Sequence, residues 1–287
     1  MKHLLKFFLI IFVVGCASMK KKELSPEFAK WAAIKSPTAG DTQIYGTYQA
    51  GCIAGAKPLP LSGTGYYVAH MSRARFYGHP TMIAYLTELG EKLKKKKYPT
   101  MLIGDISYPR GGPFLNGHAS HQVGLDADIS LTASKLLPAE MSGEDWAAPS
   151  FVQGRKVLLE SWSKEQTQLI EQAADSASVN RIFVSPAIKK YFCETHATSP
   201  WLYKLRSWWG HDDHIHVRLN CPSESVNCKS QAALDPSNNG CGKDLDWWFS
   251  AEADAEAAKM EAAEETNPEP RTFPVLPPEC EAIKNSI

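Results

Sequence analysis

Residues 118–130 read HASHQVGLDADIS, a stretch whose alternating end predicts a strand and the direction of its polar side chains. Apolar and polar residues alternate over 125–131, and they do so again in the run HIHVRL at 214–219. Alternation over a short run is typical of a β-strand with one face in a core. Because neighbouring side chains of a strand point to opposite faces, Asp126 and Asp128 share one face. The two runs therefore predict separate strands with polar side chains on one face.

Histidines gather in the same parts of the chain. Five of the nine lie in 118–130 and in 211–219, which reads HDDHIHVRL. His214 and His216 share one face of their strand, as the two aspartates do. Imidazoles and a carboxylate that converge from separate strands suit Zn²⁺, and three protein ligands with one open position is the catalytic arrangement. A lone His-x-His pair is often only packed or exposed, but this clustering favours a metal site.

Patterns elsewhere in the chain complete a mixed architecture. Pro80 opens an apolar repeat with helical spacing, which ends in the basic run 94–97. Ser163 and Gln166 form a capping box that opens a second helix. Further strands are predicted at 100–105 and 181–184. Because no regular βαβ rhythm appears, we expect an α+β fold. It would be a single domain with a central antiparallel β-sheet that carries the zinc site, flanked by helices and long disulfide-tied loops.

The overall composition limits the class of partner. The 287 residues include 31 Lys and Arg and 31 Asp and Glu, so the formal net charge is zero, and 44% are hydrophobic. A nucleic-acid-binding protein normally carries a basic footprint. We therefore expect an ordinary globular protein with no nucleic-acid partner.

The first residues have the form of an export signal. Lys2 and Lys6 precede a short apolar run that ends in Val-Val-Gly-Cys at Cys16. The run is too short to cross a bilayer, and its end resembles a bacterial lipobox. We expect 1–15 to be a lipoprotein signal peptide and Cys16 to be lipidated, with a soluble export signal as the alternative. Ala17 resembles the pattern sent to the outer membrane, so the expected location is the periplasm, at that membrane.

Changes in composition mark the ends of the expected domain. Residues 16–40 are polar and then loosely patterned, which predicts a tether before a domain at 41–287. The Ala/Glu-rich run 251–265 predicts an exposed helix or disorder, and a proline-rich run follows it. Cys280 lies beyond that run, so we expect the tail 251–287 to be tied back to the domain.

Cysteine usage fits an oxidising compartment. Besides Cys16 the chain has six cysteines, and an even number in an exported protein predicts three disulfides. The sequence itself leaves about fifteen pairings open.

These motifs resemble the penicillin-insensitive murein endopeptidase family of zinc peptidases, in the group of lysostaphin-type and D-Ala-D-Ala metallopeptidases. The signature H-x₆-D with a distant H-x-H is matched by His121 to Asp128 and by His214-Ile-His216. The likeness runs from about residue 45 to the C-terminus. Its further blocks are AGCIAGAKPLP (50–60), RFYGHP (75–80), LIGD (102–105), RIFVSPAIKK (181–190) and LNCPSESVNC (219–228).

The resemblance implies roles for the residues of the motifs. His121, Asp128 and His216 would be the zinc ligands, with the open position for the nucleophilic water. His214 would act as general base or as a hydrogen-bond donor to the developing oxyanion. His211 would share the acid–base and transition-state work.

Other features stay open or follow from the same resemblance. His118 would line the cleft, bind adventitious metal or support its loop, and Asp126 would lie behind the ligands or at the strand edge. The implied disulfides are Cys52–Cys280, Cys193–Cys241 and Cys221–Cys228. Four tryptophans either shape a cleft or pack in the core, the commoner role; they are Trp208, Trp209, Trp247 and Trp248.

The implied activity belongs to the zinc peptidase domain at 41–287. It is the hydrolysis of peptide cross-links in bacterial peptidoglycan, at the D-alanyl–meso-diaminopimelyl bond, by a route that β-lactams do not inhibit. The implied partners are the cross-link peptides and, through the lipid anchor, a membrane. Two alternatives remain: a D,D-carboxypeptidase or amidase with the same metal shell, and a non-catalytic cell-wall-binding lipoprotein.

Overall fold

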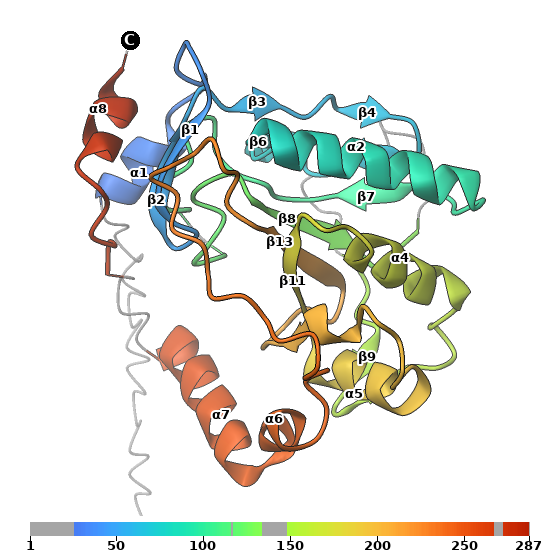
Figure 1. Ribbon diagram of the computed structural model, residues 1–287. Helices are drawn as coiled ribbons and strands as arrows, with labels where there is room; N and C mark the ends of the chain where they lie inside the picture. Colours follow the sequence, from blue (N-terminus) through green and yellow to red (C-terminus); the bar gives the residue numbers. More distant parts are fainter. Residues whose placement is uncertain (1–25, 116, 134–147, 267–271, 287) are drawn as a thin grey trace, which may run out of the picture.

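The computed structural model describes residues 26–115, 117–133, 148–266 and 272–286 (Figure 1). The helices are α1 (Pro26–Ala32), α2 (Pro80–Lys95), α4 (Lys164–Ala174), α5 (Pro186–Thr195), α6 (Lys243–Asp246), α7 (Ala251–Thr266) and α8 (Glu279–Asn285), with 3₁₀ helices η1 (Met71–Arg73), η2 (Leu202–Lys204) and η3 (Trp247–Phe249). The strands are β1 (Gln43–Thr47), β2 (Ala50–Ala54), β3 (Lys57–Pro58), β4 (Ser62–Gly63), β5 (Tyr66–Val68), β6 (Tyr77–Gly78), β7 (Met101–Ile103), β8 (Asp126–Ser130), β9 (Val152–Gln153), β10 (Lys156–Val157), β11 (Val179–Val184), β12 (Leu205–Ser207) and β13 (His214–Leu219).

A mixed sheet contains both of the strands that the alternating sequences predict. Within the described ranges it has seven strands in the order β12-β11-β13-β8-β7-β5-β4. Its central pairs are antiparallel, but β11–β12 and β5–β7 are parallel. The α+β class is confirmed, whereas the expectation of a purely antiparallel sheet is wrong. Each parallel pair is joined through a helix, α5 or α2, which is the crossover that parallel strands require.

Two amphipathic helices lie side by side against the sheet (Figure 1). The inward side of α2 buries Met82, Leu86, Leu89 and Leu93, which is the apolar repeat read from the sequence. The predicted capping box of α4 forms through Ser163 and Gln166. Tyr85 of α2 donates a hydrogen bond from its hydroxyl to the carbonyl of Ala173 in α4 at 2.9 Å, which joins the two helices.

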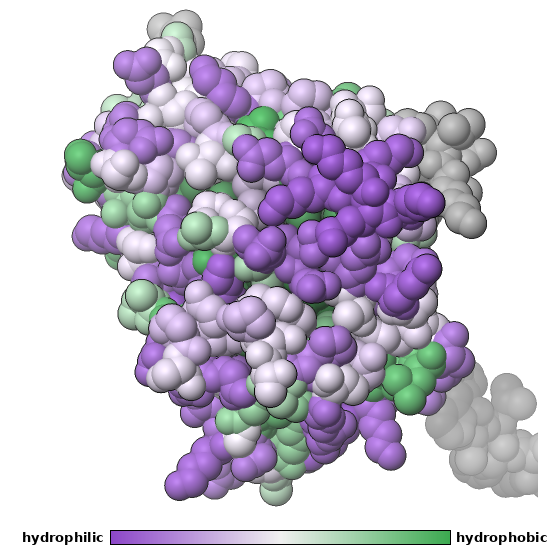
Figure 2. Space-filling view, turned by 45° about the vertical axis from the view of Figure 1, so that its right-hand side comes forward, coloured by the Kyte–Doolittle hydropathy of each residue, from purple (hydrophilic) through white to green (hydrophobic). Residues whose placement is uncertain are grey.

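The surface on this side of the molecule is hydrophilic. Figure 2, which turns the right-hand side of Figure 1 forward, shows a largely hydrophilic face with small separate hydrophobic patches. In the described part of the chain, no helix has the length and apolar character needed to cross a bilayer. The expected signal peptide 1–15 and the lipidation site Cys16 lie outside the described residues.

The two ends of the described chain pack on the β1–β2 hairpin. Trp31 of α1 is buried in a cluster with Cys52 of β2 and with Cys280 and Ile283 of α8. Part of the segment expected to be a tether is therefore a packed helix, and the folded body begins before residue 41. Figure 1 shows α1 and α8 together at this end, whereas α7 lies apart from α8. The disulfide between Cys52 and Cys280 attaches α8 to this end of the fold, and Ala251–Thr266 is helical.

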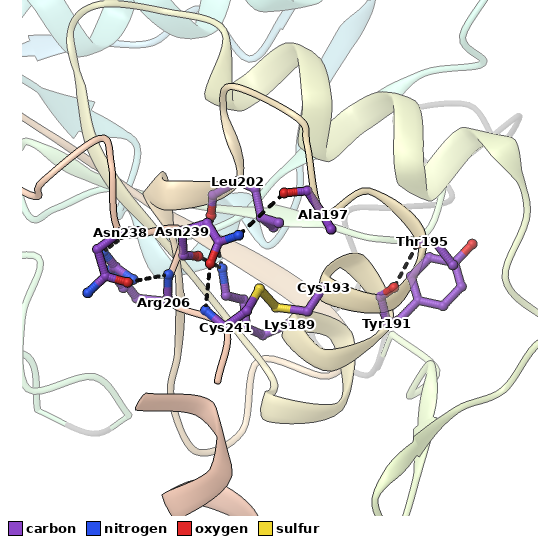
Figure 3. The surroundings of a disulfide bond; sticks show 11 residues. Lys189, Tyr191, Cys193, Thr195, Ala197, Leu202, Arg206, Asn238, Asn239 and Cys241 are labelled. Carbon is purple, nitrogen blue, oxygen red and sulfur yellow. Dashed lines mark hydrogen bonds between the residues drawn. A yellow bond between two sulfur atoms is a disulfide. The ribbon is translucent and has the colours of Figure 1, made fainter. Parts of the chain in front are cut away.

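Three disulfides fix the loops, and their pairs are those that the family resemblance implies. They are Cys52–Cys280, Cys193–Cys241 and Cys221–Cys228. Figure 3 shows Cys193 of α5 bonded to Cys241, at the end of a long loop. Asn239 of this loop donates to the carbonyl of Ala197 at 3.3 Å, and its Oδ1 accepts from the backbone N–H of Cys241 at 3.0 Å. The disulfide and these bonds hold the start of α6 against α5.

Loss of the Cys193–Cys241 bond is expected to lower the free energy of unfolding. Its cysteines are 48 residues apart, and the chain-entropy model gives about 4 kcal/mol for Cys193→Ser with Cys241→Ser. The matched control removes Cys221–Cys228, which are 7 residues apart, and should cost about 2 kcal/mol. Denaturant unfolding of both double variants measures the difference. An equal or larger loss in the control would contradict this order.

Candidate metal centre and active site

Two antiparallel strands bring together the polar faces of both motifs. In the register of β8 and β13, His216 lies opposite Asp128, and Arg218 lies opposite Asp126. His214, two residues before His216, extends the same face. Since opposed side chains on one face of a sheet are neighbours, the two alternating sequences form one continuous polar surface.

The loop before β8 fixes the orientation of His121. Its backbone is left-handed with φ 67°, a costly conformation for a residue with a side chain. Its N–H donates to Oδ2 of Asp126 at 3.0 Å, and its Nδ1 lies 2.9 Å from the carbonyl oxygen of Ile106, which leaves Nε2 for the site. Gly124 has φ 68°, and a Cβ there would lie 2.9 Å from Cα of Gly78. This approach explains the glycine in HQVGLD.

Four side chains have the composition and spacing of a metal site. His118, His121, Asp128 and His216 each offer a ligand atom, and these atoms all lie within 4.8 Å of one another. Nε2 of His121 and Nδ1 of His216 lie 3.4 and 3.7 Å from Oδ1 of Asp128. Nε2 of His118 lies 3.1 Å from the other carboxylate oxygen, Oδ2. The structure thus brings the three expected ligands together and places His118 with them.

Buried ligand atoms in this group fit a cation. Among the residues that the structure describes, Nε2 of His121 and Oδ1 of Asp128 are buried with no hydrogen-bond partner. Burying such atoms unpaired is costly, and a cation between them would satisfy both. Mixed imidazole and carboxylate ligands suit a divalent transition metal.

Burial and neighbouring charges favour the metal-binding protonation states of His216 and Asp128. Burial lowers the pKa of His216 to about 4, although Asp126 opposes this. Burial alone would raise the pKa of Asp128, but the surrounding histidines hold it well below its ordinary value. A neutral imidazole and an ionised carboxylate are the forms in which these residues bind metals.

Two further histidines lie beside the metal-binding group. Nε2 of His214 is 3.7 Å from Oδ1 of Asp128, and its Nδ1 is 2.5 Å from Oδ1 of Asp213. Burial opposes the charged form, but Asp128 and Asp213 raise the pKa of His214 to about 9. The His211 ring lies 4.9 Å from the His214 ring, and burial with two nearby histidines lowers its pKa to about 3. The pair therefore combines a proton donor with a neutral imidazole.

Sequence reasoning missed the residues that hold these histidines. Asp213 directly precedes His214 in the HDDH run and bonds to it, and this position in the motif is the signal that could have identified it. Asp105 lies with Oδ2 3.8 Å from Nε2 of His118 and accepts from Nη1 of Arg75 at 2.7 Å. No spacing in the sequence links these segments. Only the folded sheet brings Asp105 to the site.

A pocket of about 340 Å³ opens onto the histidines. It is lined by Gln49, Gly117, His118, Ala119, Ser120, Phe183, Trp208, Trp209, His211, His216, Arg218, Gln231 and Met260. Trp208 is 45% exposed, and its ring centroid lies 5.5 Å from that of Trp209 and 6.2 Å from that of Trp248. Trp247 contacts Trp209 and Trp248 in turn. These tryptophans form a cluster beside the site, so the expectation of core packing is wrong for them.

Comparison with known proteins shows the family of the chain. The family model of penicillin-insensitive murein endopeptidase matches residues 44–285. A relative of that name from Haemophilus influenzae is 43% identical over 262 residues, which are 89% of this chain and 88% of the relative. Relatives of the same name from Klebsiella pneumoniae (strain 342) and Yersinia enterocolitica are 41% and 38% identical, over 88% and 91% of this chain and 90% and 92% of their own. This chain therefore belongs to the penicillin-insensitive murein endopeptidase family.

Proposed function

We propose that this chain is a zinc-dependent murein endopeptidase that hydrolyses D-alanyl–meso-diaminopimelyl cross-links in peptidoglycan. The observation that carries the proposal is the convergence of His121, Asp128 and His216, whose buried ligand atoms include two without partners among the described residues. Relatives at 43% and 41% identity bear the name of this activity.

The three ligands of the proposal use defined atoms. His121 would bind through Nε2 and His216 through Nδ1, since these nitrogens face Oδ1 of Asp128. When bound there, zinc supplies a Lewis acid for the scissile carbonyl and makes a water molecule nucleophilic at neutral pH. His118 faces the other oxygen of Asp128 and lines the pocket, so it would border the substrate side of the site.

His214 is the proton-handling residue of the proposal. Asp213 holds its Nδ1, so that Nε2 points toward Asp128 and the reacting groups. In this orientation Nε2 donates a hydrogen bond to the developing oxyanion, or a proton to the leaving amine. His211 keeps its Nδ1 at 2.8 Å from the carbonyl of Trp209 and assists as a neutral imidazole.

The pocket beside the histidines would receive the peptide next to the scissile bond. Indole faces and the amides of Gln49 and Gln231 line it, and such a mixture is typical of ligand sites. A metal-assisted route needs no serine acyl-enzyme, so β-lactams would not block it. Ser161 and Lys164 of a Ser-x-x-Lys run at the start of α4 are both exposed, and neither residue lines this pocket.

The proposed location is the periplasm, with the protein anchored to the outer membrane. Its support is the sequence pattern of an export signal at 1–15, the resemblance to a lipobox before Cys16 and the three disulfides of the body. The substrate of the proposed activity is found in this compartment.

Removal of zinc is expected to abolish hydrolysis reversibly. Dialysis of the purified protein against a chelator should reduce cleavage of cross-linked muropeptides by at least roughly 10³-fold, because several kcal/mol of transition-state stabilisation is lost. Added Zn²⁺ should restore it, and penicillin should have no effect. Product chromatography of digested sacculi measures the loss of cross-linked dimers.

The same digestion separates the alternatives. Release of terminal D-Ala without loss of dimers would indicate a carboxypeptidase, and release of whole stem peptides from the glycan would indicate an amidase. Cleavage that resists the chelator would contradict the metal-dependent route. Binding to sacculi without any cleavage would favour a cell-wall-binding protein.

A further inference from the structure

Arg218 is a buried arginine beside the proposed metal site, and its hydrogen bonds go to Asp126 and Gln231. Arg218 donates from Nε to Oδ1 of Asp126 at 2.7 Å and from Nη2 to Oδ2 at 3.2 Å. Its Nη1 donates to Oε1 of Gln231 at 2.8 Å. The guanidinium carbon lies 4.3 Å from the ring centroid of Tyr48 and 5.1 Å from that of Phe183. Arg218 is thus held at both edges and between two aromatic rings.

Asp126 connects this arginine to two of the proposed ligands. Its Oδ1 lies 3.0 Å from Nε2 of His216, and its Oδ2 accepts from the backbone N–H of His121 at 3.0 Å. Asp126 is fully buried, and the strand register places its pair with Arg218 two pairs along from the pair of His216 and Asp128, on the same face of the sheet. One carboxylate therefore lies against a ring on β13 and accepts a hydrogen bond from the left-handed backbone of the loop before β8.

We propose that Asp126 and Arg218 form a positioning pair for the metal site, with Gln231 holding Arg218 from the far side. Asp126 holds the His216 ring so that Nε2 carries the proton and Nδ1 faces Asp128. It also accepts a hydrogen bond from the backbone N–H of His121 and so holds the loop before β8. Arg218 fixes the carboxylate with two parallel hydrogen bonds. This inference rests on the proposed function, because it concerns the ion which that function requires.

The physical basis is the orientation of a ligand by a partner on its other nitrogen. Carboxylates that accept from a metal-bound histidine fix its tautomer and ring orientation, and their loss typically reduces metal affinity about 10–100-fold. A buried carboxylate shared by two segments needs a positively charged side chain that is held in one orientation. The planar fork of arginine meets that need, whereas lysine offers a point charge on a flexible stem.

The test is the zinc affinity of the purified protein, measured by competition with a chromophoric chelator. Asp126→Asn keeps the shape and removes the charge, and we expect it to weaken zinc binding about 10–100-fold. Arg218→Lys should also weaken zinc binding. The double variant should lose less than the product of the two single losses, because the two residues act through one contact. Long-range nitrogen NMR of the zinc-loaded protein should show His216 protonated at Nε2.

A matched control separates positioning from general stability. Arg181 on the neighbouring strand β11 is also buried, and it donates to Oδ1 of Asn180 and to the carbonyl of Ala232, next to Gln231. Arg181→Lys should lower the melting temperature of the metal-free protein without changing zinc affinity. Equal losses of affinity in Arg181→Lys and Arg218→Lys would assign the effect to folding and overturn the proposal.

A milder variant covers the case in which Asp126→Asn does not fold. Gln231→Ala leaves every charge in place and should weaken zinc binding by a smaller factor. Unchanged affinity in both Gln231→Ala and Arg218→Lys would overturn the positioning role alone. If the unmodified protein bound no zinc, the proposed function would fail, and this inference would fail with it.

Discussion

Replacing His216 by alanine is expected to abolish zinc binding and hydrolysis together. His216 is 4% exposed, and its Nδ1 faces Oδ1 of Asp128, so the substitution removes one of the three proposed ligands from the centre of the site. With the ion lost, the rate of cross-link cleavage should fall by at least roughly 10³-fold, since the metal supplies several kcal/mol of transition-state stabilisation. Zinc content by mass spectrometry and cleavage of purified cross-linked muropeptides measure the two effects.

A histidine outside the site provides the control for this variant. His196 lies at the C-terminal end of α5 and packs on Phe192, with ring centroids 5.2 Å apart. His196→Ala should keep one zinc ion per chain and full activity. A His216→Ala protein that retained stoichiometric zinc would show that His216 is not a ligand.

Replacing His214 by alanine is expected to reduce turnover while leaving zinc in place. Its Nε2 is buried without a hydrogen-bond partner in the described structure, and Asp213 holds its other nitrogen. Positioned proton transfer typically contributes about 10²–10⁴-fold to the rate, so kcat should fall by that factor. Zinc content and kcat, measured on the same preparation, distinguish this residue from a ligand.

Asp213→Asn tests the orientation of His214. An asparagine keeps the shape but removes the charge that holds Nδ1, so the loss in kcat should be smaller than in His214→Ala. If His214→Ala retained full activity, the proton-handling role would be wrong. If it lost its zinc as well, His214 would belong with the ligands.

The centre of the fold could be predicted because its signals are local. Strict alternation in HIHVRL defines β13 over the same residues, 214–219, and the apolar repeat after Pro80 defines α2. Alternation also predicted the face of each strand that carries Asp128 or His216, and the strand register then places these two residues directly opposite each other. Arg218 obeys the same alternation, so the sequence already contained the signal for its place beside them.

The remainder depended on contacts between distant segments. The parallel pairs β5–β7 and β11–β12 join short strands whose sequences do not show direction. The helix α1 packs because Trp31 meets a disulfide 228 residues in span, which no local pattern shows. The left-handed turn at His121 and the approach of Asp105 to His118 are likewise products of the folded sheet.

The most direct test of the metal centre is to locate zinc in the protein itself. Anomalous diffraction at the zinc edge from crystals of the zinc-loaded protein would show the ion and its ligands. We predict one ion in contact with Nε2 of His121, a carboxylate oxygen of Asp128 and Nδ1 of His216, at zinc–ligand distances of about 2.0–2.2 Å. An ion bound elsewhere, or no ion between these three residues at saturating zinc, would contradict the proposed active site.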